Sequence, residues 1–200
     1  MTAFTYRTIK SSTEGLMKER GSKFLSYAYP AANEDDIKTR LDELRNQYPD
    51  ATHICYAWVL GVDGTHYRAN DDGEPKNSAG QPILRAIKSL DLTHVLVAVV
   101  RYYGGKKLGV PGLIEAYGTG AKEALDEAEI VTKTLQHRFH LRHVLAKDYL
   151  VYEYANREGF EIVEAPSKPG EPFIIQIPAE RADALQACFK SLPNFELSET

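Results

Sequence analysis

The sequence predicts an α+β protein made of two parts that meet near residue 130. Both parts mix strand-like segments with segments of helical spacing. The second part follows the order β-α-β-β-α-β, which is the ferredoxin-like split βαβ pattern. With 200 residues, 43% of them hydrophobic and 26% charged, the chain has the composition of an ordinary soluble globular protein. Its length suits one large domain or two small ones.

The first part, residues 1–130, opens with strand patterns at 4–9 and 23–30, the second after a turn at Gly21. Residues 33–48 predict a helix, because Asn33 is a suitable N-cap and three acidic residues follow it near the positive end of the helix dipole. The apolar face of this helix consists of Ile37, Leu41, Leu44 and Tyr48. A strand at 53–60 then turns through 61–64 into another at 65–69.

A polar loop at 70–81 leads to a second helix, for which Pro82 is well placed as the first residue. Its apolar stripe consists of Ile83, Ile87 and Leu90. Residues 94–100 are apolar without alternation, which indicates a strand covered on both faces. A glycine-rich segment follows and leads to a helix at 112–128. The core face of that helix consists of Leu113, Tyr117, Ala121 and Ala124.

The second part, residues 131–200, has strand patterns near 133–141, 160–165, 172–178 and 195–199. One helix pattern spans roughly 143–157, and Leu145, Tyr149 and Tyr152 are spaced for one apolar face. The other helix begins after Pro178. Its apolar residues are Ala182, Leu185, Phe189 and Leu192.

Charge and cysteine content restrict the functional classes. The net charge is −4 and neither part has more Lys and Arg than Asp and Glu, so a nucleic-acid site has to be a local patch. Cys55 and Cys188 form no metal-binding C-x-x-C pair, which favours reduced, buried thiols in a cytoplasmic protein. Residues 1–12 lack the apolar run of a signal peptide, and the longest apolar run, 95–100, is too short to span a bilayer.

The glycine-rich segment at 99–121, VVRYYGGKKLGVPGLIEAYGTGA, is the first candidate site. It is not a Walker A loop, because Val110 and Pro111 stand where Lys and Ser or Thr are needed. The dinucleotide fingerprint fails at Glu123. Two interpretations stay open. Free amides at the helix start near Gly112, with no acidic residue from 93 to 114, suit an anion. Alternatively, the glycines only turn a strand into a helix.

The polar loop is the second candidate. Asp71, Asp72 and Glu74 are close enough in sequence to hold Mg²⁺, and they could also cap turns. An EF-hand is excluded because Pro82 occupies the twelfth loop position. We favour an ordered polar loop over a metal site, although loops of this length are often functional.

Two further groups of residues have a structural and a functional interpretation. His53 and Cys55 lie on one face of the strand at 53–60, but no orienting third group stands nearby, which favours a buried thiol and a hydrogen-bonded histidine over a nucleophilic pair. Tyr102 and Tyr103, beside Arg101, could stack on bases or serve as core and rim aromatics.

Four segments together resemble the IMPACT/YigZ family. They are RGSKFLSYAYP, ATHICYAWVLG, RANDDGEPKNSAGQPIL and VVRYYGGKKLGVPGLIEAYGTGAKEAL, in order and correctly spaced. The resemblance implies a first domain, residues 1–130, like the second domain of a small-subunit ribosomal protein, a left-handed βαβ type. It implies a ferredoxin-like second domain, residues 131–200, similar to the last domain of elongation factor G. These relatives touch RNA or ribosomes, eukaryotic family members regulate translation, and no established reaction comes with the family.

The resemblance carries over two sets of signature positions. In the glycine-rich segment these are Arg101, Tyr102, Gly104, Gly105, Gly109 and Gly112; together with the two lysines between them, Lys106 and Lys107, they form the candidate phosphate- or nucleic-acid-binding set. The acidic-loop set consists of Arg68, Asp71, Asp72, Glu74 and Ser78. Ser78 keeps the hydroxyl of a family threonine. Glu115 stands where many members carry a basic residue, which weakens the positive field at the start of the last helix of this domain.

Two functional hypotheses follow. The first is a non-enzymatic protein, without a cofactor, that binds RNA, the ribosome or a translation-associated protein through Arg101, Lys106 and Lys107. The second is a Mg²⁺-dependent enzyme or binding protein for a phosphorylated small molecule or nucleotide. In it, Asp71, Asp72 and Glu74 would hold the metal and the glycine-rich loop the phosphates. The second hypothesis requires the two loops to meet in space.

Overall fold

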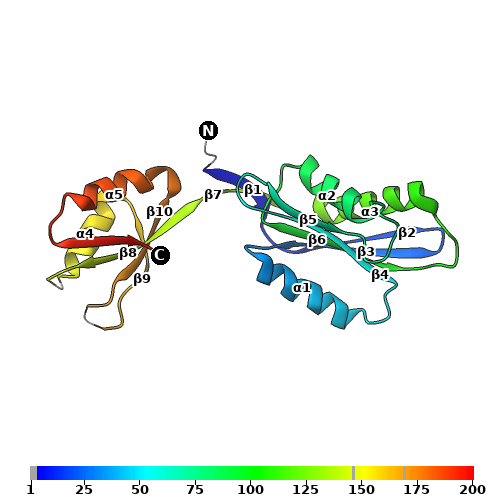
Figure 1. The fold of residues 1–200 in the computed structure, drawn as a ribbon, viewed down its shortest axis with the longest axis horizontal. Coiled ribbons are helices and arrows are strands. Elements are labelled where there is room, and N and C mark those ends of the chain that lie inside the picture. Colours follow the sequence, from blue (N-terminus) through cyan, green and yellow to red (C-terminus); the bar gives the residue numbers. More distant parts are fainter. Residues whose placement is uncertain (1–3, 146, 169) are drawn as a thin grey trace. The chain divides into compact units, whose positions relative to one another are not determined.

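The computed structural model describes residues 4–145, 147–168 and 170–200 (Figure 1). Helices and strands are mixed throughout, which confirms the α+β class. The chain divides into two compact units, one ending at Lys133 and the other running from Thr134 to Thr200.

The first unit is built around a five-stranded antiparallel sheet in the order β2-β3-β6-β4-β5. Its strands are β2 Thr13–Glu19, β3 Ser22–Pro30, β4 His53–Leu60, β5 His66–Asn70 and β6 Val95–Tyr102. β6 lies in the middle, and every residue of it before Tyr102 is buried. The segment at 94–100, whose apolar run begins at Val95, is therefore correctly predicted as a strand covered on both faces.

One helix covers one face of this sheet and two cover the other (Figure 1). α1 (Glu34–Gln47) lies on the first face, while α2 (Gly80–Ser89) and α3 (Gly109–Asp126) lie on the second. Alternate residues of β6 serve two separate cores. Val95, Val97 and Val99 belong to the core under α2 and α3, and Leu96, Ala98 and Val100 to the core under α1. Because side chains alternate along a strand, β6 packs against the helices on both faces of the sheet.

The first helix begins where its sequence predicts. The Asn33 side chain accepts a hydrogen bond from the Asp36 backbone N–H at 2.8 Å, which is the expected N-cap. The predicted inner face is confirmed for Ile37, Leu41 and Leu44, which are buried.

Two strands of the first unit were not predicted as such. β2 lies at the sheet edge, so its alternation is weak, and Leu16 is 52% exposed. β7 (Ile130–Thr134) pairs with β1 (Thr5–Ile9) and precedes β8, whereas the sequence patterns indicate one strand near 133–141. In addition, α3 begins at Gly109, three residues before its predicted start.

The second unit has the ferredoxin-like arrangement. Its four-stranded antiparallel sheet has the order β11-β8-β10-β9, in which the first and third strands lie in the middle. The strands are β8 Gln136–His143, β9 Glu161–Glu164, β10 Phe173–Pro178 and β11 Phe195–Glu199. The helices are α4 (Tyr149–Glu158) and α5 (Ala182–Lys190), the latter preceded by a short 3₁₀ turn, η1 (Ala179–Arg181).

The predicted inner face of the helix near 143–157 is wrong. α4 begins only at Tyr149, and His143 still belongs to β8. Leu145, Tyr149 and Tyr152 are 61%, 60% and 49% exposed, whereas Val151 is the buried residue of the helix. The predicted face counted residues of the preceding connection as helix, which shifted the helical stripe to the wrong side. Across the described residues, no helix combines the length and apolar character needed to span a membrane.

Candidate functional site

The glycine-rich loop after β6 packs directly against the turn between β2 and β3. Figure 1 shows the turn and the loop at the same end of the sheet. The Gly104 N–H donates a hydrogen bond to Ser22 Oγ at 3.1 Å. A Cβ on Gly104 would lie 1.9 Å from the Gly21 carbonyl carbon, so no larger residue fits there. Gly105 has open space around it and a φ of +84°, so glycine is favoured there by the left-handed backbone of the turn and not by close packing.

This packing gathers five cationic side chains from two segments. Lys18, Arg20 and Lys23 come from the β2–β3 hairpin, and Lys106 and Lys107 come from the loop just past Gly104. All five are exposed. We call this set the basic tip. Three carboxylates border it, those of Glu19, Asp50 and Glu115, so the tip keeps an excess of positive charge.

The start of α3 adds backbone donors next to the basic tip. Its first turn, Gly109 to Gly112, contains no acidic residue, and the N-cap residue Leu108 offers no capping side chain. Residues 109–111 are exposed. Free N–H groups at such a helix start favour an anion. Glu115 and Arg20 both line a groove of about 600 Å³ beside this turn, so an acidic residue borders the same groove as a cation of the tip.

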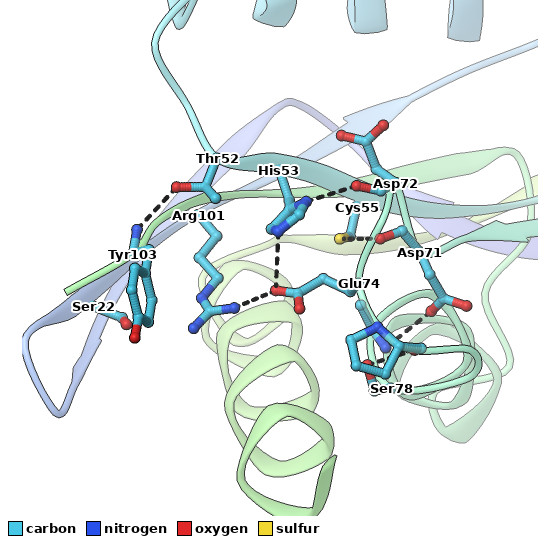
Figure 2. Close-up of polar contacts among 12 residues, drawn as sticks. Ser22, Thr52, His53, Cys55, Asp71, Asp72, Glu74, Ser78, Arg101 and Tyr103 are labelled. Carbon is cyan, nitrogen blue, oxygen red and sulfur yellow. Dashed lines mark hydrogen bonds and ion pairs between the residues drawn. The ribbon is translucent and has the colours of Figure 1, made fainter. Parts of the chain in front are cut away.

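Arg101 does not belong to the basic tip, contrary to the sequence-based hypothesis that it contacts phosphate. Its side chain is only 6% exposed and forms an ion pair with Glu74, which is 5% exposed (Figure 2). The guanidinium group lies 5.4 Å from the centre of the Phe24 ring and 5.5 Å from that of Tyr103. The cause is strand alternation, which points Arg101 to the same side as Val97 and Val99, under α2 and α3.

Glu74 is the centre of a buried polar cluster. Besides Arg101, its Oε1 accepts a hydrogen bond from the Tyr117 hydroxyl at 2.8 Å and lies 3.9 Å from His53 Nε2. The polar loop and the glycine-rich segment therefore meet in space, through Glu74 on one side and Arg101 and Tyr117 on the other. Because these contacts are buried, we assign them a structural role: they hold the two segments against each other.

The other acidic-loop residues also bond to the protein itself. Asp71 Oδ1 accepts from the N–H groups of Ala79 and Gly80 at 3.0 and 2.8 Å, and its Oδ2 accepts from the Asn77 N–H at 2.8 Å. Asp72 Oδ2 accepts from the Ile54 N–H at 2.7 Å. The Ser78 hydroxyl donates to the Pro75 carbonyl at 2.6 Å. These bonds order the loop and the start of α2, as the turn-capping interpretation expects.

Metal binding therefore finds little support in this loop. Within residues 4–145, 147–168 and 170–200, no group of three or more His, Cys, Asp or Glu side chains is arranged to hold an ion. Arg68 lies apart, exposed on β5 opposite Trp58.

His53 and Cys55 have the structural roles that their sequence favours. His53 Nδ1 is hydrogen-bonded to the Asp72 carbonyl at 2.7 Å, and the Cys55 thiol donates to the Asp71 carbonyl at 3.0 Å (Figure 2). Burial raises the pKa of the Cys55 thiol well above its ordinary value, so it stays protonated and poorly nucleophilic. Burial likewise raises the pKa of the Tyr117 hydroxyl.

Sequence reasoning missed the hairpin half of the basic tip. Lys18, Arg20 and Lys23 lie within six residues around the turn at Gly21, in KERGSK. That cluster is a usable signal of a cationic turn. The sequence alone indicated this cluster only weakly, because β2 was not predicted and because nothing in the sequence shows that the turn packs against the loop at Gly104.

Fold and site together define an α+β protein that presents an exposed cationic surface beside a buried polar cluster. Residues 20–125 match the family described as the Impact N-terminal domain. The match covers more than half of the chain, which therefore belongs to the IMPACT family and confirms the resemblance given by the motifs.

Individual relatives agree with this assignment. The IMPACT family member YvyE of Bacillus subtilis (strain 168) is 35% identical over 136 residues, which cover 68% of this chain and 63% of YvyE. YigZ of Escherichia coli (strain K12) is 36% identical over 115 residues, covering 56% of each protein. The chain thus spans between about half and two thirds of the length of these two relatives. A crystal structure of a hypothetical protein aligns with all of this chain and 98% of its own, with a TM-score of 0.77 and 24% identity, and shares the fold.

Proposed function

We propose that this chain is a non-enzymatic binding protein of the translation apparatus, which binds RNA through the basic tip. One observation carries the proposal: two segments more than eighty residues apart place five exposed cations at one end of one sheet. Within the described ranges, the ion pairs of these side chains are limited to Arg20 with Glu19, at 3.6 Å. The cations are therefore available to phosphate groups.

Local charge supports RNA as the ligand despite the overall charge of −4. Lysine and arginine bind a phosphate backbone by releasing condensed counterions, and this depends on the local patch. The exposed start of α3 also favours an anion, through its free N–H groups and the positive end of the helix dipole. Family membership directs the proposal to RNA of the ribosome or to a translation-associated complex, in the cytoplasm.

The phosphoryl-transfer hypothesis has less support. It required Asp71, Asp72 and Glu74 to hold Mg²⁺ across from the glycine-rich loop. Instead, Asp71 caps backbone amides and Asp72 accepts a hydrogen bond from the Ile54 N–H. Glu74 forms a buried ion pair with Arg101. We therefore assign these residues to the ordering of the loop.

The proposal is tested by measuring the affinity for ribosomes and for a model RNA across a series of salt concentrations. The double variant Lys106→Ala/Lys107→Ala should bind more weakly and show a flatter dependence of log K on log salt. The matched control is Lys38→Ala/Lys122→Ala, which removes two exposed charges from α1 and α3 away from the tip. Absence of binding at low salt, or the same loss in both double variants, would contradict the proposal.

A further inference from the structure

The basic tip borders an open groove on the α1 face of the sheet. The groove has a volume of about 570 Å³. Its lining comprises Leu16, Leu25, Tyr48, Tyr102, Lys18 and Lys23, with Asp50 at the side of Tyr102.

Strand register arranges these side chains in two neighbouring rows. Leu16 on β2 lies opposite Leu25 on β3. Two residues further along, Lys18 lies opposite Lys23, and Lys23 lies opposite Tyr102 on β6. Residues two apart on a strand share a face, so an apolar row runs directly beside a row of two lysines and a tyrosine.

The aromatic ring of this groove is held in place. The Tyr102 hydroxyl donates to Asp50 Oδ1 at 2.9 Å, and the ring packs at the margin of the core under α1. In the apolar row beside it, Leu16 is 52% exposed and Leu25 is half-buried. A fixed ring next to these aliphatic groups offers an apolar surface to a ligand.

The charges fix how a nucleotide would lie in the groove. Lys18 and Lys23 attract a phosphate at the β2–β3 side, whereas the Asp50 carboxylate beside Tyr102 repels one. The base then lies toward Tyr102 and the leucines, where stacking and apolar contact stabilise it.

We propose that this groove is a nucleobase subsite, and that the basic tip consequently prefers single-stranded RNA to duplex RNA. This inference rests on the proposed function, because the tip supplies the phosphate contacts. A base enters the groove only if one of its faces is uncovered. In a duplex both faces are stacked, so a duplex reaches the lysines of the tip and leaves the groove empty.

The test compares a single-stranded RNA oligonucleotide with its duplex of equal length, at the same salt concentration. The single strand should bind about tenfold more tightly, as expected for one stacked base. A 2-aminopurine base in the single strand should change its fluorescence on binding, because it stacks in the groove.

Leu16→Glu is the main variant, since Leu16 is exposed and its replacement leaves the core intact. It should abolish the preference for the single strand and the 2-aminopurine signal. Leu145→Glu, at another exposed leucine (61%, against 52% for Leu16) in the second unit, is the matched control and should change neither. Tyr102→Phe, which keeps the ring, should retain the preference that Tyr102→Leu reduces.

Equal affinity of the wild-type chain for single strand and duplex would overturn the nucleobase subsite while leaving the proposed function standing. An unchanged preference in a folded Leu16→Glu chain would overturn it in the same way. Failure of both RNAs to bind at low salt would overturn the proposed function together with the subsite.

Discussion

The buried pair of Glu74 and Arg101 gives the sharpest stability prediction. In Glu74→Ala, the guanidinium group of Arg101 keeps its charge at a site where the side chain is 6% exposed, and the Tyr117 hydroxyl loses its acceptor at 2.8 Å. Arg101 Nε already has no hydrogen-bond partner among the described residues, so the protein offers little compensation. An uncompensated buried charge of this kind costs about 3–5 kcal/mol.

Urea unfolding followed by tryptophan fluorescence measures this cost. Trp58 is the single tryptophan of the chain, lies on β4 and is 4% exposed, so it reports on the first unit. With a slope of about 2 kcal/mol per molar urea, the expected shift of the midpoint is about 2 M.

The control breaks an exposed pair of the same chemistry. Arg40 and Glu43 are 2.8 Å apart on α1 with side chains 46% and 54% exposed, so Glu43→Ala should cost less than about 1 kcal/mol. If Glu74→Ala costs no more than Glu43→Ala, the reasoning on the buried cluster is refuted.

Four further predictions concern the glycines, the thiols and the metal. Gly104→Ala should destabilise the first unit in urea more than Gly105→Ala does, because the new Cβ at position 104 would lie 1.9 Å from the Gly21 carbonyl carbon. Gly105 has open space around it, so an alanine there meets only the cost of the left-handed conformation, about 1–2 kcal/mol. The reverse order of the two variants would contradict the assigned packing. Thiol labelling at pH 8 should modify the partly exposed Cys188 and leave Cys55 unmodified until urea is added, and rapid labelling of both would contradict the burial of Cys55. The raised pKa of Cys55 also predicts a pH effect: the folded thiol stays protonated while the unfolded one ionises, so stability is complete below about pH 9 and declines above it, which urea titrations at pH 8 and 10 should detect. Millimolar Mg²⁺ with a nucleotide should leave the Tm unchanged, because the loop carboxylates already bind protein groups, and a rise of several degrees would revive the metal hypothesis.

Much of the fold follows from local patterns that the sequence displays directly. β6 was predictable because both of its faces are buried, which leaves an uninterrupted apolar run. α1 was predictable because a capping Asn33 and a regular apolar stripe agree with each other. β2 was not, since an edge strand with Leu16 exposed lacks a clear alternation. The helical face of α4 was misassigned because the apolar stripe was counted from Leu145, whereas the helix begins at Tyr149; its N-cap residue, Asp148, forms no side-chain capping hydrogen bond.

The candidate site was only half predictable. Lys106 and Lys107, proposed from the sequence as phosphate contacts, are exposed, but their sequence neighbour Arg101 lies on the buried side of β6 and pairs with Glu74. That difference depends on strand alternation and on a partner 27 residues away, and neither is visible as a motif. The hairpin cations joined the site only through the contact of Gly104 with Gly21, a tertiary contact between distant segments.

The salt dependence of RNA binding tests most directly whether the hairpin and the loop form one binding surface. It is measured as the slope of log K against log salt for the wild-type chain, for Lys18→Ala/Lys23→Ala and for Lys106→Ala/Lys107→Ala. If both segments contact phosphate, each double variant lowers the slope by about 1.4, at roughly 0.7 per charge for a single strand. A slope that falls in one double variant and stays at the wild-type value in the other would contradict a shared surface.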